Sequence, residues 1–439
     1  MKTIRIINGK VVNEGLITEN DILIKNNRIK NISKSIKGSK NEYIYDAKGK
    51  FIFPGMIDAH VHFREPGLEK KGTINTESGA AVSGGITSIM EMPNTKPAAT
   101  TNKILEEKFE LAKKNCISNY SFYLGASNSN FDELDSIDKK NVCGIKLFLG
   151  SSTGNLMVDS SSQIEKIFKN AKVPVALHCE VDSIIRKNEK TARELFGEKV
   201  PFNQHGKIRS EDACYQSSKF AVELAKKYGT QIHILHMTTA KELELFSNDD
   251  VNKKNITVEA CPHHLWFYDE NYDLKGSHIK CNPSIKTLND RNALRNALVE
   301  NIIDTVGTDH APHLLNEKEN TYFNAPSGMP IVQSAIPSLL EFLPPALVVQ
   351  KTSHNPSMIF KCKDRGFIRE DYFADLTIID NQKSHIVNKE NINYKCKWSP
   401  FNKIKFSSSV ISTFVNGELA YDNDKINYNI RGMRLQFNR

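Results

Sequence analysis

FPGMIDAHVHFREPG, residues 53–67, is a short apolar run that ends in two histidines. His60 and His62 are separated by one residue, so on a β-strand both imidazoles point to the same face and can reach one ion. Either histidine alone would be read more simply as a core residue satisfied by hydrogen bonds. The pair at the end of a strand that follows Pro54-Gly55 favours metal binding instead.

From Phe53 to about Arg365 the sequence alternates short apolar runs with longer helix-periodic stretches. This rhythm predicts the α/β class, as a (β/α)8 TIM barrel whose active site forms at the C-terminal ends of its strands. All but the third predicted strand place a metal-ligand or polar side chain at or just after the apolar run. The eight runs are MIDAHVHFR (56–64), TSIMEMPNT (87–95), YSFYLGAS (120–127), CGIKLFLG (143–150), PVALHCE (174–180), QIHILHM (231–237), TVEACPHH (257–264) and DTVGTDHAPH (304–313).

The two ends of the chain have a different pattern. Residues 1–52 contain short alternating runs broken by turn signals, and strand-like segments return after Ala374 in DLTIID and VISTFVNGELAY. We therefore expect a small composite β-sandwich domain, built from residues 1–52 and 366–439, beside a catalytic barrel of residues 53–365.

Composition indicates a soluble, cytoplasmic protein. The chain has 439 residues, 39% of them hydrophobic and 25% charged, and no apolar run reaches the ~20 residues of a membrane span. The N-terminus alternates apolar and polar residues, which is typical of a strand and not of a secretory signal. The eight cysteines form no C-x-x-C pair, so we expect reduced thiols. The net charge of +8 is spread along the chain, and neither nucleic-acid nor membrane partners are expected.

The strand ends supply too many ligands for one catalytic zinc, which normally takes about three protein ligands and keeps a position open for water. Two metals are therefore predicted. A pair of cations needs an anionic bridge, and the candidate on the fourth strand is Lys146, if carbon dioxide converts its amine to a carbamate. The nitrogen and carboxylate ligands are His60, His62, His178, His236 and Asp309.

Several separate motifs, in order along nearly the whole chain, resemble the amidohydrolase superfamily and within it the dihydroorotases. They are DAHVHFREPG, EMPNT, GIKLFLGSSTGN, ALHCE, ILHMTTAKEL, EACPHHLWF, GTDHAPH, NPSMIF and ADLTIID. The resemblance implies a TIM barrel with a β-sandwich from both termini and a binuclear zinc centre with a bridging hydroxide.

The family's metal roles fall on particular residues of this sequence. One ion would be held by His60, His62 and Asp309, and the other by His178 and His236, with carboxylated Lys146 as the bridge. Some dihydroorotases use an aspartate a few residues later as the bridge, but LFLGSSTGN contains no carboxylate. Lys146 is therefore favoured.

The choice of substrate is predicted from the pocket, since related enzymes share the metal centre. Arg64, two residues after His62, could grip a carboxylate bidentately. Dihydroorotate has a carboxylate, whereas hydantoin, dihydrouracil and allantoin have none. The alternatives are a surface salt bridge of Arg64 with Glu65 or Glu69, and a simple turn role for Asn94. The resemblance implies that Asn94 and His313 assist Arg64, and that Asn282 and the backbone around Ser327 and Gly328 contact the ring amides.

The sequence thus predicts a dihydroorotase, which closes N-carbamoyl-L-aspartate to dihydroorotate for pyrimidine synthesis with Asp309 as general base and acid. An allantoinase, a hydantoinase or an inactive scaffold stays open, although the scaffold reading expects lost metal ligands and all six positions are occupied. His263 and His264 have no assigned role beyond packing or supporting hydrogen bonds. GSSTGN (150–155) is predicted to form a mobile lid, and the oligomeric state is open, a homodimer included.

Overall fold

The computed structural model describes residues 3–39, 41–150 and 156–439, and its centre is a barrel of eight parallel strands. The strands are hydrogen-bonded in sequence order, and a parallel bridge between Val61 and His310 brings the first and last strand ends together. The predicted TIM barrel is confirmed. Its strands are β8 (Met56–Val61), β9 (Ile86–Glu91), β10 (Asn119–Gly125), β11 (Gly144–Phe148), β12 (Val175–His178), β13 (Ile232–Met237), β14 (Ile256–Ala260) and β15 (Thr305–Val306).

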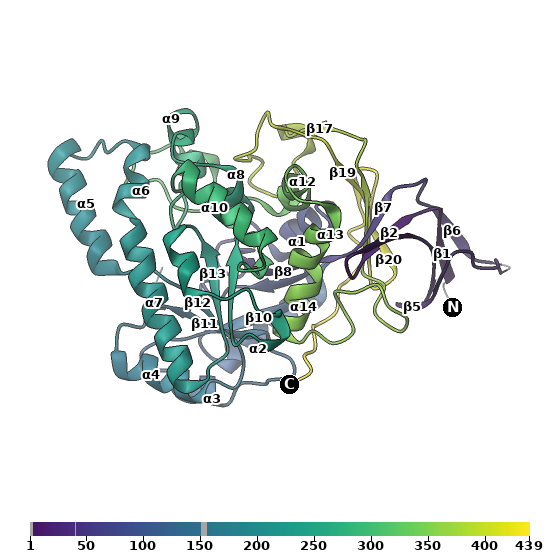
Figure 1. Cartoon of the computed structure of the whole chain (residues 1–439), viewed down its shortest axis with the longest axis horizontal. Coiled ribbons are helices and arrows are strands. Elements are labelled where there is room, and N and C mark those ends of the chain that lie inside the picture. The colour runs from purple at the N-terminus through teal and green to yellow at the C-terminus, as the bar shows by residue number, and fades with distance from the viewer. Residues whose placement is uncertain (1–2, 40, 151–155) are drawn as a thin grey trace.

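Helices surround the barrel, so its strands are covered on both faces and buried nearly throughout (Figure 1). Short polar side chains start several helices: Thr101 accepts a hydrogen bond from the Ile104 amide, and Ser210 from the Ala213 amide. The α-helices are α1 (Ile74–Ser83), α2 (Asn102–Asn115), α3 (Phe131–Asp135), α4 (Ser161–Asn170), α5 (Asp182–Phe196), α6 (His205–Ile208), α7 (Glu211–Tyr228), α8 (Pro262–Trp266), α9 (Asn271–Lys275), α10 (Leu288–Val299), α11 (Leu315–Lys318), α12 (Ala335–Leu340), α13 (Pro345–Val349) and α14 (Asn355–Phe360).

Shorter helical turns complete the connections between these elements. A helix break falls at Pro344-Pro345, since α12 ends before it and α13 starts at Pro345. The turns are η1 (Phe202–Gln204), η2 (Lys241–Leu245), η3 (Val251–Lys253), η4 (Gly276–Ile279), η5 (Val332–Ser334), η6 (Gln350–His354, π-helical) and η7 (Lys389–Asn391).

Two further sheets stand beside the barrel, at the right of Figure 1. One has the strand order β5-β4-β1-β6 and the other β21-β20-β19-β16-β7-β2-β3, so N- and C-terminal strands share the larger sheet. Apolar side chains from both sheets, including Ile6, Ile22, Ile52 and Leu376, pack in one core. The strands are β1 (Thr3–Ile7), β2 (Lys10–Asn13), β3 (Leu16–Glu19), β4 (Asp21–Lys25), β5 (Arg28–Ser33), β6 (Tyr43–Asp46), β7 (Phe51–Pro54), β16 (Leu376–Asp380), β19 (Ser409–Val415), β20 (Glu418–Asp422) and β21 (Lys425–Ile426).

The segment between β16 and β19 returns to the barrel. It contains a two-stranded ribbon, β17 (His385–Ile386) and β18 (Lys405–Phe406), and its buried Tyr394 and Trp398 join the main core. The Trp398 indole Nε1 donates a hydrogen bond to the His313 carbonyl oxygen at 2.7 Å. This segment therefore contacts the barrel directly at the C-terminal ends of its strands.

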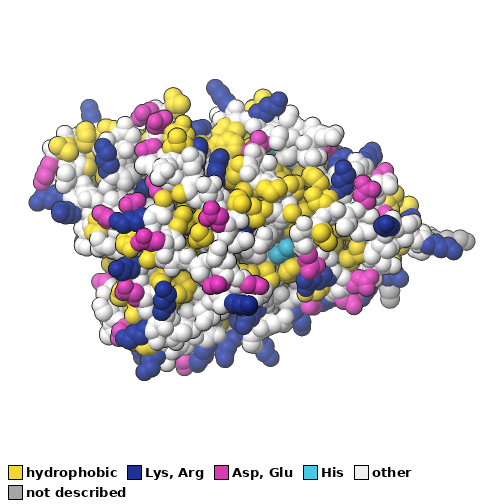
Figure 2. Space-filling view, viewed as in Figure 1, with side chains coloured by type: hydrophobic (Ala, Val, Ile, Leu, Met, Phe, Trp, Pro, Cys, Tyr) yellow, Lys and Arg dark blue, Asp and Glu magenta, His cyan; other side chains and the backbone are white. Residues whose placement is uncertain are grey.

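The visible surface mixes charges of both signs, as Figure 2 shows, with half-buried apolar side chains of α12 and α13 near its middle. The eight cysteines are free thiols, as expected, and only Cys396 is not fully buried. No helix in the described ranges is both long and apolar enough to cross a membrane.

Candidate active site

A cavity of about 840 Å³ lies at the C-terminal ends of the barrel strands. Parallel strands all end on this side, so residues far apart in sequence converge here. Every residue to which the sequence analysis gave a site role lines the cavity. These are His60, His62, Arg64, Asn94, Lys146, His178, His236, Asn282, Asp309, His313, Ser327 and Gly328.

His60 of β8 and His62, which directly follows this strand, converge on one carboxylate. His60 Nε2 lies 3.2 Å, and His62 Nε2 3.0 Å, from Asp309 Oδ1. Burial opposes ionisation of Asp309, but the neighbouring imidazoles hold the pKa of its carboxyl well below the usual range. Their donor atoms lie within 4.8 Å of one another, so the three side chains could hold a metal ion.

A second histidine pair lies on the neighbouring strand ends. His178 Nδ1 and His236 Nε2 are 3.0 Å apart, with the rings nearly perpendicular. Burial lowers the pKa of both imidazoles, which favours the neutral form that binds metals. The ring centres of His60 and His236 are 5.3 Å apart, so the two groups share one part of the cavity.

The outer nitrogens of the first pair are held by oxygen acceptors. His60 Nδ1 lies 2.8 Å from Glu259 Oε1, and His62 Nδ1 lies 2.8 Å from Asn94 Oδ1. With Nδ1 of each ring bonded to these acceptors, Nε2 is the atom on which a metal ion would replace the proton, which is the arrangement that supporting hydrogen bonds give to metal-binding histidines. Asn94 thus orients His62, a contact that the sequence analysis did not include.

Glu180 supports the second pair in the same way. Its Oε2 lies 2.8 Å from His178 Nε2, and Arg209 Nε donates to its Oε1 at 2.9 Å. Although burial opposes ionisation, Arg209 and His178 hold the pKa of the Glu180 carboxyl far below its ordinary value. Sequence reasoning missed Glu180 and Glu259, although both stand within the quoted strand-end motifs.

Lys146 projects from β11 into the same cavity. It is fully buried, and its Nζ lies 4.5 Å from the centre of the Phe148 ring. It forms no hydrogen bond or ion pair with the described parts of the chain. Burial lowers the pKa of the Lys146 ammonium to about 7, so much of this group is a neutral amine at neutral pH.

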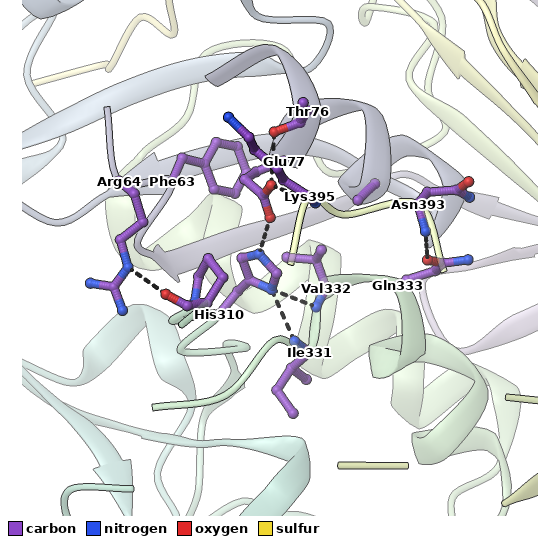
Figure 3. Close-up of polar contacts among 12 residues, drawn as sticks. Phe63, Arg64, Thr76, Glu77, His310, Ile331, Val332, Gln333, Asn393 and Lys395 are labelled. Atoms are coloured by element: carbon purple, nitrogen blue, oxygen red, sulfur yellow. Dashed lines mark hydrogen bonds and ion pairs between the residues drawn. The ribbon is translucent and has the colours of Figure 1, made fainter. Parts of the chain in front are cut away.

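Arg64 lies on the cavity wall beyond His62. Its Nε donates to the Pro312 carbonyl oxygen at 3.0 Å (Figure 3), and its Nη2 lies 3.1 Å from His313 Nε2. Burial lowers the pKa of the Arg64 guanidinium to about 10, so it remains charged at neutral pH. It makes no salt bridge within the described ranges, and the predicted alternative with Glu65 or Glu69 is not seen.

Residues of α11 and of the loop that follows β8 hold His313 in place. Lys71 Nζ lies 3.0 Å from His313 Nδ1 and 3.1 Å from Glu317 Oε1, and His313 Nε2 lies 3.1 Å from the Ser327 carbonyl oxygen. Burial lowers the pKa of His313 to about 3. Because an ammonium can only donate, Nδ1 accepts from Lys71, and Nε2 carries the proton and donates to Ser327. Arg64 Nη2, which is also a donor, therefore makes no hydrogen bond to this ring.

The ring-contacting residues predicted by resemblance also border the cavity. Asn282 Oδ1 is buried without a partner among the described residues, and is therefore available to a ligand. The Gly328 amide already donates to the Lys280 carbonyl oxygen at 2.9 Å. Lys318 Nζ donates to three carbonyl oxygens, those of Lys280, Pro326 and Gly328, and so holds both sides of Ser327.

Other sequence expectations are not placed in the cavity. His263 and His264 do not line it, and His264 Nε2 donates to the Pro283 carbonyl oxygen at 3.1 Å. Both remain without an assigned role. Of the predicted lid 150–155, residues 151–155 lie outside the described residues.

Comparisons with known proteins agree with this geometry. The model of the Amidohydrolase family matches residues 51–420. A dihydroorotase of Methanosphaera stadtmanae is 33% identical over 98% of this chain and 97% of its own, and one of Staphylococcus epidermidis is 30% identical over 97% and 100%. Among solved structures, an L-hydantoinase (dihydropyrimidinase) from Arthrobacter aurescens has a TM-score of 0.91 at 24% identity, covering 97% of this chain and 98% of its own. At that identity the likeness concerns the fold alone.

Proposed function

Because the chain belongs to the amidohydrolase family, we propose that it interconverts N-carbamoyl-L-aspartate and dihydroorotate, as a dihydroorotase of pyrimidine synthesis. One observation carries the choice of substrate. The buried Arg64 guanidinium borders the same cavity as the histidine cluster and has no carboxylate partner among the described residues. A substrate carboxylate would supply the missing partner. The relatives named dihydroorotase, similar over almost the whole chain, support the same choice.

We propose that the cavity holds two zinc ions. The donor set fits, because the inner nitrogens of His60 and His62 face Asp309 while their outer nitrogens are held by Glu259 and Asn94. These three ligands would hold one ion, and His178 with His236 would hold the other. When bound, the two ions would supply Lewis acidity and a water that is deprotonated near neutral pH.

Lys146 would supply the anionic bridge as a carbamate. Its neutral amine adds to carbon dioxide, one proton is released, and the product is a carboxylate on Nζ. Burial that favours the free amine and the absence of a competing carboxylate partner within the described chain support this modification.

The remaining residues perform binding and proton transfer in this proposal. Arg64, Asn94 and His313 bind the substrate carboxylate, while Asn282 and the Ser327–Gly328 backbone orient the ring. Asp309 accepts a proton from the attacking water and returns it to the ring nitrogen as the C–N bond breaks. Ring closure follows the reverse order.

A substrate comparison tests the function. Purified protein with about two zinc ions per chain should open dihydroorotate at least about a hundredfold faster than dihydrouracil or hydantoin, since only dihydroorotate has the carboxylate. Chelation should abolish turnover and added zinc should restore it. Faster turnover of hydantoin or allantoin would overturn the assignment, and a chain that binds no zinc and opens no ring would favour the scaffold reading.

The bridge is tested by Lys146→Ala. The variant should lose metal and activity, because two cations would then lack the bridging anion, and a small carboxylic acid should restore part of the activity. Metal analysis and turnover with and without added acid measure this, with wild type plus acid as the control. An alanine variant with full metal content and full turnover would exclude Lys146 as the bridge.

A further inference from the structure

A buried glutamate–histidine pair includes the residue that follows Asp309 in the chain. His310, the next residue after Asp309, points its Nε2 at Glu77 Oε2 of α1, at 2.7 Å (Figure 3). Both side chains are fully buried, and neither lines the cavity. The metal centre and the substrate contacts therefore use neither of them.

The hydrogen bonds fix the tautomer of His310. Its Nδ1 faces two backbone donors, the Ile331 amide at 2.9 Å and the Val332 amide at 3.3 Å. Since an amide can only donate, Nδ1 must be the acceptor, and the ring proton sits on Nε2 and is donated to Glu77. The ring is held from both ends in one orientation.

The backbone of His310 ties the catalytic strand ends together. Its carbonyl oxygen accepts from the His62 amide at 2.8 Å, and bridges join the residue to Val61 on one side and Met329 on the other. Asp309 itself has φ of +47°, in the left-handed region that non-glycine residues rarely adopt. Such a backbone persists only where its surroundings enforce it.

The other oxygen of Glu77 reaches the C-terminal segment. Glu77 Oε1 accepts from Thr76 Oγ1 at 2.8 Å and from the Lys395 amide at 3.1 Å. Nearby, the Asn393 amide donates to Gln333 Oε1 at 2.9 Å. The carboxylate thus links α1, the Asp309 turn and the segment 391–395, and both of its oxygens are engaged.

From these contacts we propose that Glu77 and His310 are positioning residues, which hold Asp309 in its strained conformation at the reacting atoms. The proposal rests on the proposed role of Asp309 in proton transfer. The pair acts through the backbone, since His310 and Asp309 are neighbours and the His310 ring cannot turn without breaking bonds to Glu77, Ile331 and Val332.

The principal test is Glu77→Gln. An amide offers one acceptor oxygen in place of two, so either His310 Nε2 or the Thr76 and Lys395 donors must face an NH2 group. We expect kcat for dihydroorotate to fall at least about tenfold while KM changes less than about threefold, because alignment for proton transfer is lost and the Arg64 contact remains. Zinc content should stay at the wild-type value.

A matched control makes the same chemical change elsewhere. Glu242 is also buried and accepts hydrogen bonds from Ser218 Oγ and Thr239 Oγ1 at 2.6 and 2.7 Å, but does not line the cavity. Glu242→Gln should leave kcat unchanged. Equal loss in both variants, or full kcat in Glu77→Gln, would overturn the proposal.

A second variant keeps both polar partners. A Cβ at Gly72 would lie 2.9 Å from Glu77 Cδ, so Gly72→Ala should displace the carboxylate and lower kcat by at least about threefold. Nitrogen-15 NMR of labelled histidine gives a readout that needs no substrate: wild type should show His310 protonated on Nε2, and both variants should alter this signal. An unaltered signal in both variants would overturn the proposal. If wild type fails to open dihydroorotate but shows this tautomer, the proposed function fails and the geometry of the pair stands.

Discussion

Arg64 is anchored through one edge of its guanidinium, because Nε binds the Pro312 carbonyl oxygen, and burial makes an unpaired charge costly. A substrate carboxylate would compensate this cost with hydrogen bonds worth roughly 1.5 to 3 kcal/mol. Arg64→Ala should therefore lower kcat/KM for dihydroorotate by about tenfold to a hundredfold and leave zinc content unchanged. Steady-state kinetics and metal analysis measure both.

Two comparisons sharpen this prediction. Arg64→Lys should rescue only part of the loss, since an ammonium lacks the planar fork. Dihydrouracil, which has no carboxylate, should be an almost equally poor substrate for wild type and Arg64→Ala. Full dihydroorotate activity in Arg64→Ala would favour a hydantoinase or an allantoinase instead.

In the proposed function, Lys71 would act on the substrate carboxylate through His313. The Lys71 ammonium donates to His313 Nδ1 and thereby keeps the proton on Nε2. Lys71→Met should release this constraint and raise KM for dihydroorotate about threefold to thirtyfold, with a smaller change in kcat. Lys70→Met, at the exposed neighbouring position, should match wild type. An unchanged KM in Lys71→Met would show that His313 needs no fixed tautomer.

At the level of single residues, the sequence analysis identified residues that line the cavity but missed the residues that hold them in place by hydrogen bonds. His60 and His62 could be found because two-residue spacing on a strand fixes their direction. Glu259 is 199 positions from His60, and Lys71 is 242 positions from His313, so only the folded chain shows these pairs. No local pattern distinguishes such a residue from an ordinary surface or core charge.

At the level of the elements, the position of the loop after α11 depends on one lysine, Lys318. Lys318 Nζ donates to carbonyl oxygens on both sides of Ser327, and Lys318→Met would leave these acceptors without a donor, at about 1–3 kcal/mol each. We expect a lower melting temperature and a KM for dihydroorotate raised by at least about fivefold, because the loop loses its fixed position.

The control is Lys351→Met in η6. Lys351 is equally buried and donates to the Ile303 carbonyl oxygen and to Asn301 Oδ1, away from the cavity. It should lower the melting temperature without changing KM. Thermal unfolding and kinetics on both variants separate an effect on stability from an effect on KM. An unchanged KM in Lys318→Met would refute a role for the loop position.

Sequence periodicity predicted the elements that alternate regularly, and it failed where hydrogen bonding across the fold decides the structure. The β8 strand and the Pro344-Pro345 helix break follow from local rules. The predicted eighth strand in 304–313 is also present, but β15 has only two residues, and this extent is set by pairing with β14. By contrast, the return of Trp398 to the barrel has no local signal.

For the whole molecule, Glu242 makes stability depend on pH. Burial raises the pKa of its carboxyl from 4.5 to about 7, so between these values the folded state keeps a proton that the unfolded state releases. Stability therefore falls as pH rises through this window, by up to about 3 kcal/mol. Glu242→Gln cannot ionise, and should unfold at a higher temperature than wild type at about pH 8 but not at about pH 5. A variant whose unfolding temperature exceeds that of wild type equally at both pH values would contradict this account.

The larger sheet of the β-sandwich joins strands from opposite ends of the chain, with Ile52 of β7 opposite Ile378 of β16. A ribosome adds about 5–20 residues per second, so roughly 15 to 60 seconds separate the synthesis of these two strands. During that time the nascent chain carries an open sheet edge and apolar side chains such as Ile6 and Ile22 without their final cover. The barrel is synthesised before the C-terminal strands that complete the β-sandwich. A chaperone that covers the N-terminal strands during this interval would raise the yield of folded protein.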